Sequence, residues 1–245
     1  MVAVSGTRTA LAATVKEFAR TPILVALLVV LPAYFVGLLG VVLPDAQVVV
    51  SIPGWSAQSA LSEGVLPMLG TLAAVMVAGI AGLFLTVDTL DADGWLALSG
   101  LPSRTLFVAR AAALTGAAAL ASVAATVVLA LHVVPEQPDV FLGATLVLAV
   151  TYGLTGAIVG VVFDRLAGVY VMLFAPAVDL FLLHSPLATD PPDAAVLSPG
   201  RWAGVAAIDA ALTATPNWSA LGAGVAYLLG VAVVAAVAVG YAVDA

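Results

Sequence analysis

The chain has 245 residues, of which 63% are hydrophobic and 9% are charged, and its mean hydropathy is +1.20. These values exclude an ordinary soluble domain. The net charge of −7 argues against a nucleic-acid partner, and the absence of cysteine excludes disulfides and thiolate chemistry.

The N-terminal residues 1–22 are predicted to form a cytoplasmic amphipathic helix. On a helical wheel, Leu11 and Phe18 lie on one face, whereas Lys16 and Arg20 point elsewhere. Such a helix lies in the membrane interface. The alternative is an ordinary basic flank that only sets the orientation of the first membrane span.

Six later segments are long and apolar enough to cross a bilayer as helices, since about 20 apolar residues span a hydrocarbon core of roughly 30 Å. They run from Ile23 to Leu43, Val65 to Val87, Ala111 to Leu131, Val140 to Phe163, Leu166 to Leu183, and Ser219 to Val243. Pro32 and Pro176 lie inside the first and fifth segments and predict kinks. We therefore expect an all-α polytopic membrane protein whose six-span domain covers residues 23–245.

The basic residues predict the orientation of these spans. A cytoplasmic N-terminus places six of the seven basic residues inside the cell and leaves Arg201 outside, as the positive-inside rule requires. The six are Arg8, Lys16, Arg20, Arg104, Arg110 and Arg165. Both termini are then cytoplasmic, and the expected location is the plasma membrane. The preference for Asp among the acids, with a single lysine, is typical of a halophile and predicts an archaeal source.

Asp179 is the one charged residue inside a predicted span, and a buried charge is by default a functional hypothesis. The structural alternative is that Asp179, about four residues from the outer end of its span, reaches interfacial water. His184 lies five residues later, about 140° round an α-helix, and is not expected to pair with it. No catalytic residue and no metal site are predicted, because His132 and His184 lie outside whereas Ser99 lies inside.

Two outer loops remain. In the loop 184–218, Trp202, Val205, Ile208 and Leu212 share one helical face, which predicts an amphipathic helix on the outer leaflet. A loosely ordered loop is the alternative. The loop 44–64 receives no predicted role.

The cytoplasmic connector 88–104 carries the strongest ordering signals. Asp91 and Asp93 stand before Gly94 to Leu98, where carboxylates satisfy the free N–H groups of a helix start. Pro102 ends that short helix. It would lie across the membrane surface and present Trp95 there; the alternative is a plain interfacial loop with a Trp anchor.

The order of these features resembles the permease subunits of type-2 ABC transporters. The N-terminal match is Val15 to Pro22, the pattern after the second span runs from Asp91 to Arg104, and the Leu-Ser-Pro of residues 197–199 precedes Trp202 in the outer loop. Where the family often has a basic residue among the acids before Gly94, this chain has aspartates only.

The resemblance implies a non-catalytic subunit of an ABC exporter that is coupled to a separate ATPase subunit, which binds the ATP and Mg²⁺, so that this chain needs no cofactor. It implies a homodimer or a heterodimer with a related permease in the lipid bilayer. The residues implied in coupling are Asp88, Asp91, Asp93, Gly94, Trp95, Leu98, Pro102 and Arg104. The implied elbow helix carries Lys16, Glu17, Phe18 and Arg20. A non-transporting scaffold and an intramembrane enzyme remain the alternatives.

Overall fold

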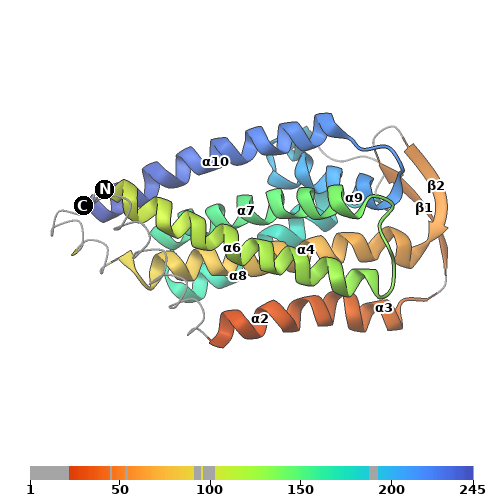
Figure 1. The fold of residues 1–245 in the computed structure, drawn as a ribbon, viewed down its shortest axis with the longest axis horizontal. Coiled ribbons are helices and arrows are strands. Elements are labelled where there is room, and N and C mark those ends of the chain that lie inside the picture. Colours follow the sequence, from red (N-terminus) through yellow and green to blue (C-terminus); the bar gives the residue numbers. More distant parts are fainter. Residues whose placement is uncertain are drawn as a thin grey trace.

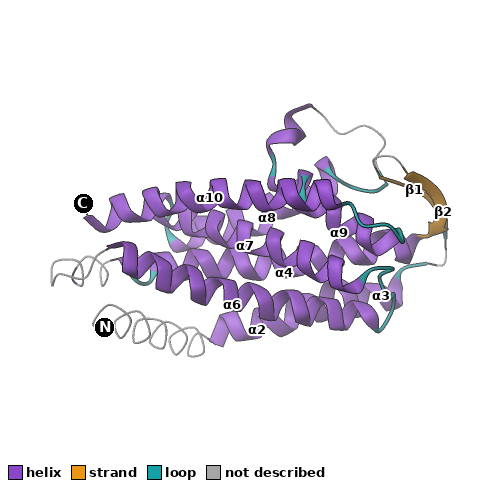
Figure 2. Ribbon diagram, turned by 45° about the horizontal axis from the view of Figure 1, so that its top comes forward, coloured by secondary structure: helices purple, strands orange, loops and turns teal. Residues whose placement is uncertain are grey.

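A computed structural model of the chain describes residues 22–44, 46–52, 55–90, 95, 103–187 and 193–244. The described residues form a helical bundle closed at one end by a β-hairpin (Figure 1). The long helices are α4 (Leu61–Val87), α6 (Ser103–Ala130), α7 (Pro138–Val162), α8 (Arg165–Ala177) with its continuation η2 (Val178–Leu183), and α10 (Trp218–Asp244). Figure 2 shows the predominance of helix over strand. The predicted elbow helix lies outside the described residues.

Five helices of the described chain are long and apolar enough to cross a membrane. They correspond to the second to sixth predicted spans, and α4 and α7 end within one residue of the predicted position. The main difference is in α6, which begins at Ser103 rather than Ala111. In the first predicted span the apolar helix of the described chain, Ala26–Val42, falls below membrane length.

Helix α4 forms the centre of the bundle and packs against α2, α6, α7 and α8. Every side chain from Gly64 to Thr86 is buried. A helix that is apolar on all sides can be buried completely, whereas a polar face would need water. By contrast, α8 and α10 bury only a minor part of their surface, and their large outward side chains are apolar, as expected for helices that face lipid.

Glycines bring α4 and α7 into direct backbone contact. A Cβ atom on Gly82 would overlap the carbonyl oxygen of Gly153, and one on Gly156 would overlap the carbonyl oxygen of Gly79. This close approach requires glycine at both positions, since only glycine leaves room for a neighbouring backbone. Beside this contact, buried Thr71 and Thr145 share a hydrogen bond of 3.2 Å between the two helices.

Both predicted proline kinks coincide with π-helix. Pro32 ends α2 (Pro22–Pro32) and is followed by the π-helix η1 (Ala33–Leu38) and by α3 (Leu39–Val42). Pro176 lies two residues before η2. Proline supplies no N–H group, so the regular ladder of hydrogen bonds is interrupted and a wider turn follows.

The loop 44–64 contains a β-hairpin, which the sequence analysis did not predict. Its strands β1 (Gln47–Ile52) and β2 (Trp55–Ala60) pair antiparallel, with Val50 opposite Ala57. Val50 is fully buried against Gly64 at the start of α4, and Ser51 N–H donates to the carbonyl of Pro186 at 2.7 Å. The hairpin thus covers one end of the bundle, called here the hairpin end (Figure 1).

The second outer loop forms η3 (Asp193–Leu197), η4 (Pro199–Arg201) and α9 (Ala203–Leu212). The predicted helix is present as α9, and it packs into the bundle. Most of α9 is buried, and it packs against α4, α7 and α10. Small residues such as Gly204, Ala207 and Ala211 allow this burial, because a helix without bulky side chains fits between its neighbours.

Candidate functional site

The end of the bundle opposite the hairpin is called here the arginine end, because Arg104, Arg110 and Arg165 lie there. It comprises the end of α4 and the beginnings of α6 and α8 (Figure 1). The connector that was predicted to receive a partner subunit leaves α4 at this end.

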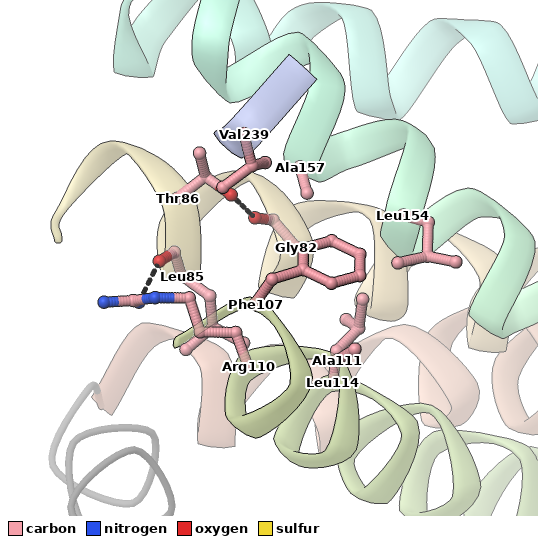
Figure 3. Close-up of a pocket in the computed structure, with 10 residues that line it drawn as sticks. All are labelled: Gly82, Leu85, Thr86, Phe107, Arg110, Ala111, Leu114, Leu154, Ala157 and Val239. Atoms are coloured by element: carbon pink, nitrogen blue, oxygen red, sulfur yellow. Dashed lines mark hydrogen bonds between the residues drawn. The ribbon is translucent and has the colours of Figure 1, made fainter. Parts of the chain in front are cut away.

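Two side chains hold the last turn of α4. The final carbonyls of a helix have no partner within it and need other donors. The carbonyl of Leu85 accepts from the Arg110 guanidinium at 2.6 Å (Figure 3). It also accepts from the Thr89 hydroxyl at 2.5 Å. Because Arg110 belongs to α6, it fixes the start of α6 against the end of α4.

Helix α8 is fixed to the same turn through Arg165. Its guanidinium lies 3.5 Å from a carboxylate oxygen of Asp88 and 4.3 Å from the centre of the Phe84 ring. Exposed ion pairs of this kind are weak, at about 0–1 kcal/mol, but the cation–π contact adds to this one. Three helices therefore meet in a fixed arrangement where the connector begins.

The connector itself is described only in part. Asp88 follows the last residue of α4, and Trp95 is helical with 74% of its surface exposed. Arg104 is exposed near the start of α6. The other predicted coupling residues, Asp91, Asp93, Gly94, Leu98 and Pro102, lie outside the described residues, as do Lys16, Glu17, Phe18 and Arg20 of the predicted elbow.

A cavity lies beside the Arg110 contact, between α4, α6, α7 and α10 (Figure 3). Its lining comprises Gly82, Leu85, Thr86, Phe107, Arg110, Ala111, Leu114, Leu154, Ala157 and Val239. Its volume of about 20 Å³ accommodates little more than one water molecule. We interpret it as a packing gap where four helices meet, and not as a ligand site.

A second polar cluster lies around Asp179, beside the middle of α7. Asp179 is only 3% exposed. Its carboxylate accepts from the hydroxyl of Tyr152 at 2.5 Å, from Nδ1 of His184 at 3.0 Å and from the backbone N–H of Gly200 at 2.7 Å. These four residues are called here the Asp179 cluster. They connect α7, η2 and η4.

The structure corrects two expectations about this residue. Asp179 does not reach interfacial water through an exposed side chain, because η4 covers it. His184 does pair with Asp179, since residues 178–183 form a π-helix whose hydrogen bonds join residues five apart. The α-helical angle used in the prediction therefore does not apply.

Sequence reasoning missed Tyr152 and Gly200. Tyr152 could have been noticed as a hydroxyl near the middle of an apolar span, since such a group needs a partner. Gly200 acts through its backbone, and a Cβ atom there would lie 2.8 Å from both carboxylate oxygens of Asp179. A residue type alone does not reveal a backbone donor.

Five membrane-length apolar helices, one of which is the buried central helix α4, are consistent with an all-α protein embedded in a membrane. No protein-family model and no curated protein matches the chain.

Proposed function

We propose that this chain is the membrane-spanning permease subunit of an ATP-driven ABC exporter, and that a separate ATPase subunit docks on the connector 88–104. The observation that carries the proposal is the exposed, helical Trp95 in the connector that leaves the braced end of α4. A tryptophan with 74% of its surface exposed offers a large apolar contact for a partner.

The arrangement supports transmission of force from the connector into the bundle. Asp88 joins the connector to α4, and the side chains of Arg110 and Arg165 prevent the end of α4 from moving alone. Helix α4 in turn contacts α7 through backbone at Gly82 and Gly156. A displacement of the connector would therefore move α4, α6, α7 and α8 together, because tightly packed interfaces transmit small shifts.

The proposal includes six spans with both ends of the chain inside the cell. The start of α2 and the end of α10 lie at the arginine end (Figure 1), as a topology with an even number of spans requires. Arg104, Arg110 and Arg165 at that end, and Arg201 in η4 far from it, agree with the positive-inside rule. A homodimer or a pair of related permeases would complete the transport path.

The first experiment is purification of the tagged chain in mild detergent and high salt, followed by identification of co-purifying proteins. We expect a stoichiometric soluble subunit with a nucleotide-binding loop. With that subunit in hand, Trp95→Ala should lower the ATPase stimulation given by this chain. Trp218→Ala is the matched control, because Trp218 is 63% exposed but begins α10 at the opposite end.

Equal stimulation by the Trp95→Ala and wild-type chains would remove the coupling role. A folded chain without any ATPase partner would favour the scaffold alternative. The enzyme alternative has one observation in its favour, the Asp179–His184 pair. Within the described residues, however, the remaining ring nitrogen of His184 has no hydrogen-bond partner, so no hydroxyl nucleophile is placed on it.

A further inference from the structure

We propose that the groove beside Asp179 binds amphiphilic cations, with the ammonium group on the carboxylate and the alkyl chain along the helix α8. The groove lies between α7, α8, η2 and the start of η4 and has a volume of about 490 Å³. Small-molecule sites have volumes of roughly 300–1,000 Å³.

The groove is lined almost entirely by apolar groups, and buried polar groups contribute only a small part of its surface. The apolar lining comprises Val171, Phe174, Ala175, Val178, Leu183 and Pro199. The polar lining groups belong to Tyr152, Asp179 and Ser198. Such a combination, with few polar groups at one position, is typical of sites that orient an apolar ligand by its head group.

The groove opens on the outside of the bundle. Phe174 of α8 is 65% exposed, and Ala175 of α8 and Val178 at the start of η2 are also exposed, on the side of the bundle that faces lipid. A ligand dissolved in the bilayer therefore reaches the groove without crossing a polar surface. This access favours a molecule with an alkyl chain over a fully hydrophilic one.

The Asp179 carboxylate favours a ligand whose head group is positively charged. Within the described residues, the ion pair of Asp179 is with His184 and involves no lysine or arginine. The side chain of His184 is 1% exposed, and its Nε2 atom has no hydrogen-bond partner in the described part of the chain.

Tyr152 and Gly200 donate hydrogen bonds to Asp179 but carry no charge. In the described part of the chain, no lysine or arginine therefore lies beside the Asp179 carboxylate to offset its charge. A buried carboxylate is stabilised when a cation approaches it. A primary ammonium in the groove supplies that cation, and the rings of Tyr152 and Phe174 provide aromatic surfaces that also attract cations.

This inference does not depend on the proposed function, because binding is measured without any ATPase subunit. The chain is placed in nanodiscs of zwitterionic lipid and exposed to a dodecylamine that carries a photoactivatable diazirine on its alkyl chain. The reference probe is the corresponding alcohol, which has the same chain and no charge. Mass spectrometry of digested peptides maps the labelled residues.

We expect the amine to label the peptide containing residues 171–183 about tenfold more than the alcohol does, since a charged hydrogen bond contributes roughly one such factor. Asp179→Asn should lower labelling by the amine to about the level given by the alcohol. Ala175→Phe should reduce labelling by both probes, because the ring fills the groove without touching the Asp179 cluster. Leu182→Phe is the matched control, since Leu182 is 67% exposed on the same helix but does not line the groove.

The comparison of amine and alcohol on the wild-type chain needs no variant, so a folding defect in Asp179→Asn does not affect it. Equal labelling of residues 171–183 by the two probes would overturn the proposal. Labelling that Ala175→Phe leaves unchanged would also overturn it, because the probe would then bind elsewhere on α8.

Discussion

Gly156 of α7 lies directly against the carbonyl oxygen of Gly79 in α4, with no room for a Cβ atom between them. One helical turn away, Gly82 stands in the same relation to the carbonyl oxygen of Gly153. The contact between α4 and α7 is therefore made by backbone, and it positions the fully buried helix on which the rest of the bundle packs.

Gly156→Ala is expected to lower the free energy of unfolding by about 1–3 kcal/mol, because the added methyl group forces the two backbones apart. Unfolding can be measured by SDS titration in mixed micelles. Gly143→Ala is the matched control, since Gly143 also lies in α7 and a Cβ atom there meets nothing within 4 Å. If Gly156→Ala and Gly143→Ala lowered the free energy of unfolding equally, the backbone contact would be contradicted.

Thr89→Val and Arg110→Gln are expected to be coupled, because both side chains donate to the carbonyl of Leu85. Each single variant leaves one donor on the Leu85 carbonyl. The stability lost by the double variant should therefore exceed the sum of the losses in the two single variants. The expected coupling is about 0.5–3 kcal/mol in a double-mutant cycle. Thr115→Val replaces Thr89→Val in the control cycle, since Thr115 donates to Ala111 on the exposed part of α6. Additive effects would show that the two donors act separately.

Tyr152→Phe is expected to destabilise the protein by about 1.5–3 kcal/mol, since it removes a hydrogen bond to a buried carboxylate. Tyr170→Phe makes the same chemical change on α8, where the side chain is 55% exposed, and should have little effect. Thermal unfolding in detergent compares the two variants. A stable Tyr152→Phe protein would mean that the carboxylate does not need this donor.

The orientation of the chain can be tested by labelling single introduced cysteines. The sequence contains no cysteine of its own that would react. Val49→Cys in the hairpin, where Val49 is 60% exposed, should react with a membrane-impermeant maleimide in intact cells. Trp95→Cys should react only after the membrane is permeabilised. The opposite pattern would invert the proposed topology.

Much of the fold could be predicted from the sequence, but little of the Asp179 cluster could. Five predicted spans correspond to membrane-length helices, and Asp179 was identified as a candidate. Its partners Tyr152 and Gly200 were missed because they come from two other elements, α7 and η4. His184 was misjudged because the prediction assumed an α-helix, whereas Pro176 is followed by a π-helix. The hairpin was missed because its strands are short and lie between apolar spans.

The sequence by itself determined that the chain forms long apolar helices, because the requirement for about 20 apolar residues is local and each span satisfies it alone. The tertiary structure decided which helices are buried. Apolar residues suit both lipid and a protein core, so composition does not distinguish the buried α4 from the exposed α10. The tertiary structure also placed Tyr152 and Gly200 on Asp179, because hydrogen bonds between distant elements depend on how those elements pack.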